Sequence, residues 1–438
     1  MKRFCFAAAT AAALLTLSAE PLPDVWPGWR GPLGDGTSPL KGLPVEWSPE
    51  NNLAWKAPVP GRGHSSPVIW KDRVFLTSDI EGEVIPGAGP VKHKINNEPF
   101  VHPDSVSGNR KHTLKVLAFD VSTGKLLWER TAYEGKVYDD IHKFNTYASP
   151  TPVTDGKHLY VWFESQGLYK YDFTGKLLWS ANLGGIATLG VGTGVSPVLF
   201  EDLALLLCDQ DGGENSFLAA VSTKTGKEVW RTKRTNGLTW TTPLLVPGPQ
   251  LIVPSSEDVT AYHPRTGKEL WRAEGLENNV VHTPVAGHGM VYVSSGYPNK
   301  KTMAIRLQPR TGEERVAWRY AKGTGYLPSP LIYGDYIYLM TGAGLFTCLD
   351  ARTGEPKYES KRFPAPGQFT ASPVAFDGKI LITSNDGDTY VVKAGPEFEV
   401  LGKNALGEAV YASLAMAGDS IFVRSAGHLY RIRKTADR

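Results

Sequence analysis

The sequence predicts an all-β fold, an eight-bladed β-propeller with four-stranded blades whose ring is closed by an N-terminal strand. Three observations lead to this prediction. The chain of 438 residues holds 46 Gly and 32 Pro, so turns are frequent, and it holds 12 Trp. A hydroxyl residue followed by Pro recurs along the chain, and so does a Thr-Gly pair shortly before an aromatic residue. Four short strands in each unit of about 40–45 residues is the spacing of a propeller blade.

The hydroxyl–Pro pair marks the start of the innermost strand of each blade. From Ser149 to Ser413 six steps span 264 residues, a mean of 44 per repeat. An eighth copy, Ser413-Leu414, lacks only the Pro. Because the hydroxyl recurs at the same place in every blade, we expect it to accept or donate a backbone hydrogen bond rather than to act as a nucleophile. The pairs begin at Ser66, Ser149, Ser196, Thr242, Thr283, Ser329 and Ser372.

The Thr-Gly turn and the aromatic residue that follows it mark the outermost strand. Gly supplies the positive φ that a tight hairpin turn needs. The large ring that ends each unit is expected to lie between neighbouring blades, with its N–H free to reach a carbonyl. These aromatic residues are Trp128, Trp179, Trp230, Trp271, Trp318 and Tyr358.

The two ends of the chain complement each other. The last repeat stops after Leu429-Tyr-Arg-Ile and has no fourth strand, whereas Leu53-Ala-Trp55 matches the outermost strands with no blade before it. We therefore expect the N-terminal segment to supply the outer strand of the last blade, which removes an open sheet edge. One propeller domain then covers residues 47–438, after an N-terminal extension over 20–46.

Residues 1–19 have the pattern of a secretory signal peptide. Lys2 and Arg3 precede an apolar stretch, Phe4 to Leu17, that is short for a membrane span. No Cys follows this stretch until Cys208, so no lipid anchor is predicted. We expect the mature chain to be periplasmic or secreted, monomeric and without a transmembrane segment. The formal net charge of +3 gives no reason to expect nucleic acid as a partner, and Cys208 and Cys348, in different blades, are expected to stay unpaired.

The face where the innermost strands begin is the expected ligand-binding face, because eight loops converge there on the axis. The residue three positions before each repeat Pro is expected at the mouth of the channel, as is the residue after it in the fifth blade. Five aromatic or polar residues at these positions are candidates for ligand binding. These candidates for the pore face are His64, Tyr147, Trp240, His282 and Tyr411. Packing between blades is the alternative role for the same residues.

The first blade carries an insertion, residues 79–113, that is rich in His and Asp together with the loop after its last strand. Such residues are metal ligands, although their spacing matches no known metal motif and a solvated polar loop is the alternative. The candidate ligands are His93, His102, Asp104, His112, Asp139, Asp140 and His142.

The repeat unit Ala118-Phe-Asp-Val-Ser-Thr-Gly-Lys-Leu-Leu-Trp128 resembles the tryptophan-docking motif of pyrroloquinoline-quinone (PQQ) propeller repeats, and Asp172–Trp179 and Val221–Trp230 match it too. The opening Trp26-Pro-Gly-Trp-Arg-Gly-Pro is similar to the start of exported bacterial PQQ-like propeller proteins. The resemblance covers essentially the whole mature chain. It implies one of two functions, since the quinoprotein alcohol and sugar dehydrogenases and the scaffold lipoprotein of outer-membrane barrel assembly share this superfamily.

The sequence departs from both branches. It has no Cys-Cys pair of the alcohol dehydrogenases and no match to their calcium-ligand or catalytic Asp motifs, and it lacks the lipid-attachment Cys of the scaffold. No residue is therefore assigned a catalytic role. We expect a binding or scaffold module that takes a protein or small-molecule ligand at the propeller face. The alternative is a PQQ-dependent dehydrogenase that oxidises an alcohol or sugar with PQQ and Ca²⁺.

Overall fold

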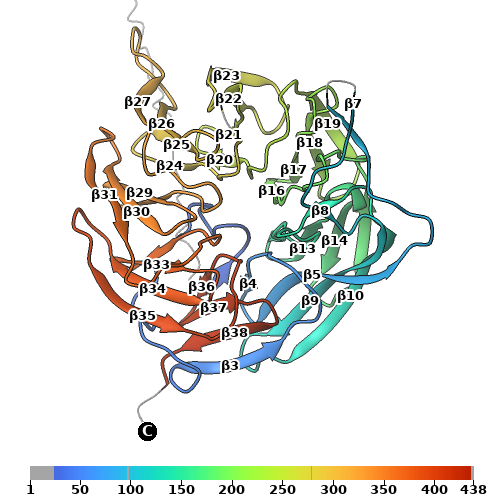
Figure 1. Cartoon of the computed structure of the whole chain (residues 1–438), viewed down its shortest axis with the longest axis horizontal. Helices are drawn as coiled ribbons and strands as arrows, with labels where there is room; N and C mark the ends of the chain where they lie inside the picture. The colour runs from blue at the N-terminus through green and yellow to red at the C-terminus, as the bar shows by residue number, and fades with distance from the viewer. Residues whose placement is uncertain (1–23, 96–97, 278, 436–438) are drawn as a thin grey trace, which may run out of the picture.

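Eight antiparallel sheets stand around a central axis in the computed structural model of the chain, which describes residues 24–95, 98–277 and 279–435 (Figure 1). This confirms the predicted eight-bladed β-propeller. The predicted signal peptide lies outside the described residues. The only helical element among the described residues is one 3₁₀ turn, Glu164–Gln166. Among the described residues no helix is long and apolar enough to cross a membrane.

Each blade has four strands, which follow in order from the axis outward. Blade one has β4 (Val68–Trp70), β5 (Arg73–Val84), β9 (Arg110–Asp120) and β10 (Leu126–Lys136). Blade two has β12 (Val153–Thr154), β13 (His158–Trp162), β14 (Leu168–Asp172) and β15 (Leu177–Ala181). Blade three has β16 (Val198–Phe200), β17 (Leu203–Cys208), β18 (Phe217–Ser222) and β19 (Glu228–Lys233). Blade four has β20 (Leu244–Val246), β21 (Gln250–Pro254), β22 (Asp258–Tyr262) and β23 (Glu269–Glu274).

The second half of the ring repeats this order. Blade five has β24 (Val285–Gly287), β25 (Met290–Ser295), β26 (Lys301–Arg306) and β27 (Val316–Tyr320). Blade six has β28 (Leu331–Tyr333), β29 (Tyr336–Met340), β30 (Leu345–Asp350) and β31 (Pro356–Arg362). Blade seven has β32 (Val374–Phe376), β33 (Lys379–Thr383), β34 (Asp388–Lys393) and β35 (Val400–Ala405). Blade eight has β36 (Ala415–Ala417), β37 (Ser420–Arg424), β38 (His428–Arg433) and, outermost, β3 (Leu53–Pro58).

The N-terminal strand closes the ring as predicted. β3 pairs antiparallel with β38, so that Lys56 lies opposite Tyr430 (Figure 1). Residues from the two ends of the chain share one buried apolar cluster, which includes Trp47, Ala57 and Ile432. The edge of β38 is therefore covered, and the last blade has four strands like the others.

The N-terminal extension is packed against the innermost strands of several blades. β1 (Val25–Trp26) adds to blade one beside β4, and β2 (Thr37–Ser38) runs parallel to β32 of blade seven. Between them, Trp29 Nε1 donates to Thr283 Oγ1 of blade five at 2.7 Å, and Arg30 Nη2 donates to the Pro330 carbonyl of blade six at 2.9 Å. The extension thus spans the channel and connects blades that are far apart in sequence.

The recurring Trp and Thr-Gly residues contact each other across blade boundaries. The ring of Trp128 lies directly over Gly175 of the next blade, and its Nε1 donates to the Phe173 carbonyl at 3.0 Å. Gly175 has φ +83°, and an added Cβ would be 2.8 Å from the ring. The same packing recurs in the pairs Trp55–Gly124, Trp179–Gly226, Trp230–Gly267 and Trp318–Gly354. Blade four differs, because no atom lies within 4 Å of a Cβ added to Gly312 and Trp271 Nε1 instead donates to Gln250 of its own blade.

The repeated hydroxyls link neighbouring blades around the channel. The Ser196 N–H donates to Thr242 Oγ1, the Thr283 N–H to Ser329 Oγ and the Ser372 N–H to Ser413 Oγ, each at 2.9–3.1 Å. The predicted structural role therefore holds for these hydroxyls, whereas Ser66 Oγ is buried and has no hydrogen-bond partner among the described residues. In blade two the position is held by Thr151, which accepts the Ser66 N–H at 2.9 Å. The predicted register of that blade, based on Ser149, is therefore wrong by two residues.

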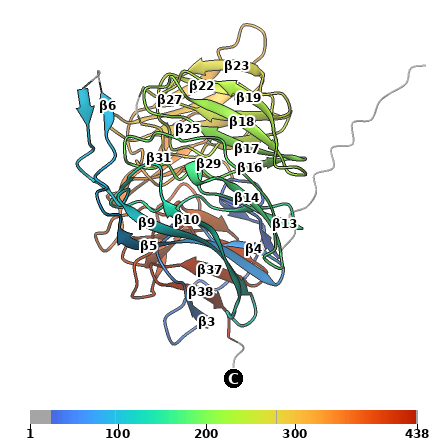
Figure 2. The ribbon, with the colours of Figure 1, turned by 90° about the vertical axis from the view of Figure 1, so that its right-hand side faces the viewer.

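The insertion in blade one begins as a continuation of the sheet. β5 and β9 extend well beyond the other second and third strands and pair from Arg73–Asp120 to Val84–Arg110. Between them, β6 (His93–Ile95) and β7 (Glu98–Phe100) form a hairpin that stands away from the ring (Figure 2). β8 (Ser105–Val106) pairs with β11 (Ile141–His142), which ties the insertion to the connection between blades one and two. Cys208 and Cys348 are buried, free and in different blades, as predicted.

Candidate functional site

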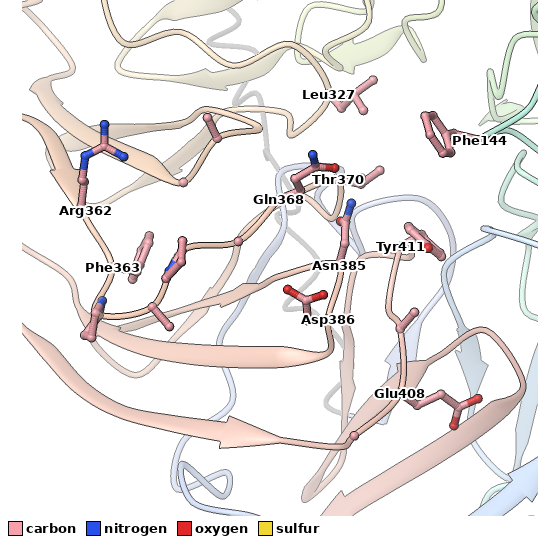
Figure 3. A pocket seen from close by; sticks show the side chains of 18 residues that line it. Phe144, Leu327, Arg362, Phe363, Gln368, Thr370, Asn385, Asp386, Glu408 and Tyr411 are labelled. Atoms are coloured by element: carbon pink, nitrogen blue, oxygen red, sulfur yellow. The ribbon is translucent and has the colours of Figure 1, made fainter. Parts of the chain in front are cut away.

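A groove of about 1040 Å³ opens where the innermost strands of blades six to eight begin (Figure 3). Its floor and walls come from the connections that enter blades six, seven and eight and from the β29–β30 and β33–β34 turns. Phe144, from the connection into blade two, lies across from them. The groove therefore lies on the face that the sequence predicts to bind a ligand.

The polar side chains of the groove are few. Arg362 lies at one end, and Gln368, Asn385 and Asp386 lie between it and Tyr411 (Figure 3). Asn385 Oδ1 is buried and has no hydrogen-bond partner within the described residues. The backbone of Asn385 is fixed, since its N–H donates to the Gln368 carbonyl at 2.7 Å and its carbonyl accepts the Val410 N–H at 3.1 Å. Because buried acceptors are normally paired, a ligand N–H could satisfy this oxygen if the side-chain amide rotated to turn it toward the groove.

Glu408 lines the groove but is tied into blade eight. Its carboxylate accepts hydrogen bonds from Tyr430 Oη at 2.6 Å and the Gly427 N–H at 2.7 Å, and it lies 2.9 Å from His428 Nδ1. Burial acts to raise the pKa of Glu408, but these hydrogen bonds lower it below its ordinary value. Glu408 is therefore a structural anion, whereas Asp386 is exposed.

Two apolar side chains on the rim face solvent. Phe144 is 72% exposed and Leu327 is 41% exposed. Isolated apolar side chains are common on surfaces, and these two border a concave region that has polar groups at its base.

Of the five pore-face candidates, the structure brings His64 and Tyr411 together. Their ring centroids are 4.9 Å apart, and Tyr411 lines the groove. His64 is half-buried, and burial, together with the charges of Arg424 and Arg62, lowers its pKa to about 3. The imidazole is therefore neutral at physiological pH.

The other three candidates have different surroundings. Tyr147 is buried and packs edge-on against His112, with ring centroids 4.6 Å apart. Its position follows from the register error in blade two, since the residue three before Pro152 is Ser149. Trp240 is half-buried and donates from Nε1 to the Gly192 carbonyl at 2.8 Å. His282 is buried, and burial lowers its pKa to about 4.

The metal-ligand candidates are distributed over several separate contacts. His93 Nε2 lies 2.8 Å from Asp139 Oδ1, while Asp139 Oδ2 accepts the Thr188 N–H at 2.7 Å. Asp140 accepts the N–H groups of Val91 and Gly108.

The remaining candidates pair in the same way. His142 lies 3.6 Å from Asp104, which also accepts from Lys143 at 2.8 Å, and the rings of His102 and His142 are 5.9 Å apart. His112 pairs with Asp79. In the described part of the chain no three His, Cys, Asp or Glu side chains are grouped so as to hold a metal ion. These contacts connect the insertion to blades two and three.

The groove does not fit the cofactor that the resemblance implies. PQQ carries three carboxylates and is bound together with a divalent cation, so its site needs several cationic donors and a set of oxygen ligands for the metal. The groove offers one guanidinium, Arg362, and two carboxylates, Asp386 and Glu408. No step is therefore assigned to a quinone.

Some lining residues were not singled out by the sequence. Phe144 and Gln368 lie in connections between blades, whereas Asn385 and Asp386 lie in a repeated turn between the second and third strands, equivalent to Gly342 and Ala343 of blade six. The repeat predicts this turn but does not mark its side chains in blade seven as part of a site. Leu327 and Thr370 stand three residues before a repeat Pro, and this spacing did place them at the channel mouth.

The comparisons with known proteins agree with this architecture. The structure of BamB from Moraxella catarrhalis superposes with a TM-score of 0.54 at 13% identity, over 81% of this chain and 99% of that one. A europium-containing methanol dehydrogenase gives 0.60 at 14% identity, over 95% and 92%. The quinohemoprotein alcohol dehydrogenase from Comamonas testosteroni gives 0.62 at 11% identity, over 96% and 82%. At these identities the likeness shows the fold alone, and both scaffold and enzyme share it.

No curated protein matches the sequence. The family model described as outer membrane protein assembly factor BamB matches residues 112–213 and 214–437, which is well over half of the chain. The chain belongs to this family of PQQ-like β-propeller proteins.

Proposed function

We propose that the protein is an exported scaffold that binds an extended segment of a partner protein in the groove of blades six to eight. The observation that carries the proposal is the buried, unpaired Asn385 Oδ1 at the base of an open groove. An extended polypeptide presents a backbone N–H at every second residue on one side, which is the donor that this oxygen lacks.

The shape and rim of the groove support the same occupant. The volume of about 1040 Å³ is large for a small metabolite. The exposed rings and branched chains at the rim, Phe144 and Leu327, offer apolar contacts to side chains on either side of a bound strand. A family model named for an assembly factor is a further argument for a protein ligand.

The competing dehydrogenase function requires the quinone. The groove lining lacks the several cationic donors and metal ligands that the three carboxylates and the divalent cation of PQQ require, and the sequence lacks the paired Cys of the alcohol enzymes. The two functions can be separated by titrating the purified protein with PQQ and Ca²⁺. Stoichiometric binding with dye-linked oxidation of an alcohol would overturn the scaffold function.

Site-specific photocrosslinking tests the proposal directly. A photoreactive phenylalanine analogue at position 144, on the groove rim, should give a discrete crosslinked protein in the source cells, mapped by mass spectrometry to one segment. The same analogue at Lys157, in the turn at the opposite ends of the inner strands, is the control and should not label that segment. Asn385→Leu should reduce the Phe144 crosslink severalfold. Equal labelling from both positions, or no effect of Asn385→Leu, would contradict the proposal.

A further inference from the structure

Arg424 is a buried cation without a counter-charge beside the groove. It ends β37, and its side chain is 2% exposed between blades eight and one. Its Nη1 donates to the backbone carbonyl and to Oγ of Ser65, at 3.3 and 2.5 Å. Both acceptors are neutral, and among the described residues Arg424 forms no ion pair. Burial lowers its pKa to about 9, and no carboxylate acts in the opposite direction.

Other buried arginines in the ring have acidic partners. Arg234 pairs with Asp209 at 2.7 Å, and Arg431 pairs with Asp419 at 3.1 Å. Removing a charge from water without a partner costs several kcal/mol. The propeller repeat does not require a cation at this position, because the residues in the same register of the other blades are uncharged. These are Thr77, Trp162, Leu207, Pro254, Ser294, Met340 and Thr383.

The residues next to Arg424 connect it to the groove. Gly63 makes room for the guanidinium, since an added Cβ would be 2.1 Å from Nη2. The next residue, His64, is close enough for the Arg424 charge to lower its pKa, and it packs on Tyr411. Tyr411 lines the groove. His64 therefore links the surroundings of Arg424 to the groove-lining Tyr411, and both its neutral imidazole and the phenol can donate hydrogen bonds.

We propose that Arg424, His64 and Tyr411 form a carboxylate-binding subsite at the inner end of the groove. A carboxylate there would supply the counter-charge that Arg424 lacks and accept charge-assisted hydrogen bonds. In the proposed function, on which this inference rests, the carboxylate belongs to the bound segment, either as an acidic side chain or as its C-terminus. A free organic acid has the same chemistry.

Simple carboxylates test the subsite without the partner. Succinate, added at constant ionic strength and pH 7, should raise the Tm of the protein and bind measurably by calorimetry, whereas succinamide should not. Arg424→Gln should weaken succinate binding at least tenfold. Arg30→Gln, which removes another buried arginine, one that lies near Asp35 and bonds the Pro330 carbonyl, is the control and should bind succinate like the wild type. Equal binding by Arg424→Gln and wild type, or equal effects of succinate and succinamide, would overturn the proposal.

Two further measurements keep the test independent of folding defects. Arg424→Met should leave the Tm of the free protein unchanged or higher, because an unpaired buried charge is removed; a large loss of Tm would indicate a purely structural role and would contradict the subsite. In protein with ¹³C-labelled histidine, succinate should raise the pKa of His64 above about 3, and the absence of any change in its titration would count against the proposal.

Peptides test whether the bound carboxylate belongs to a protein segment or to a free organic acid. A short peptide with a free C-terminal carboxylate should bind at least tenfold more tightly than its C-terminal amide and more tightly than succinate if the ligand is a protein segment. Tight succinate binding without any gain from the peptide would keep the subsite but overturn its link to a segment. Crosslinking from position 144 without any carboxylate effect would leave the proposed function standing and reject the subsite.

Discussion

His112 of β9 and Asp79 of β5 form a buried ion pair at the base of the blade-one insertion. His112 Nδ1 lies 2.8 Å from Asp79 Oδ1, and His112 Nε2 lies 3.0 Å from the carbonyl of Ser107 in the insertion. Both ring nitrogens face acceptors, so the ring is protonated at both. The two side chains are 0% and 5% exposed.

This pair predicts a pH-dependent stability. Burial acts to lower the pKa of His112, but the Asp79 carboxylate and the Ser107 carbonyl raise it above the ordinary value. The stabilisation is therefore complete below the unfolded-state pKa of about 6.5 and is lost as the pH rises through the folded-state pKa. We expect His112→Gln to cost about 3–5 kcal/mol at pH 6 and less at pH 9. Urea unfolding of both proteins at the two pH values measures this, and a cost independent of pH would contradict it.

The tryptophan–glycine contacts predict a second difference. Gly175→Ala and Gly312→Ala both place a side chain at positive φ, which costs about 1–2 kcal/mol. Only Gly175→Ala also pushes against a ring, that of Trp128, which adds about 1–3 kcal/mol. Thermal unfolding should therefore show a clearly larger loss of Tm for Gly175→Ala. Equal losses would mean that the indole ring moves aside without cost.

The repeated features could be predicted from the sequence because each occurs several times under the same physical constraint. The contact between Trp128 and Gly175 recurs at equivalent pairs around the ring. The segment Leu53–Pro58 matches an outer strand that the last blade lacks. The register error in blade two has a simple cause. The segment Ser149-Pro-Thr-Pro152 contains two hydroxyl–Pro pairs, and only the hydrogen bond from Ser66 to Thr151 distinguishes them.

The site could be predicted only in part. Spacing before the repeat Pro identified His64 and Tyr411, which do meet at the groove. Phe144 lies in a connection between blades and Asn385 in the β33–β34 turn of blade seven, and only the folded ring brings them to one cavity. Arg424 had a detectable signal, a charge at a position that is uncharged in the other blades, but its lack of an acidic partner is a property of the fold.

The buried pair Asp209–Arg234 predicts asymmetric mutational effects at the boundary of blades three and four. Arg234 Nε donates to Asp209 Oδ1 at 2.7 Å, and both side chains are fully buried. Asp209→Asn leaves the guanidinium unpaired and should destabilise the fold by about 3–5 kcal/mol. The double variant Asp209→Leu with Arg234→Met should recover much of this loss, because neither charge remains buried. Denaturant titrations of the single and double variants measure the recovery, and an additive loss would contradict it.

The N-terminal region supplies both the extension and the strand β3. A truncation that removes only the extension should therefore have a different effect from one that also removes β3. A chain beginning at Asn52 loses the extension, including the buried Trp26, Leu43 and Trp47, but keeps β3. It should remain monomeric and lose at least about 3–5 kcal/mol, the usual cost of removing one buried Trp. A chain beginning at Val59 also loses β3, so the edge of β38 is open to pairing with another molecule. Light scattering after size-exclusion chromatography should show oligomers or aggregates for this second chain only. If both chains stayed monomeric with the same Tm, the strand from the N-terminus would not be what protects the edge of blade eight.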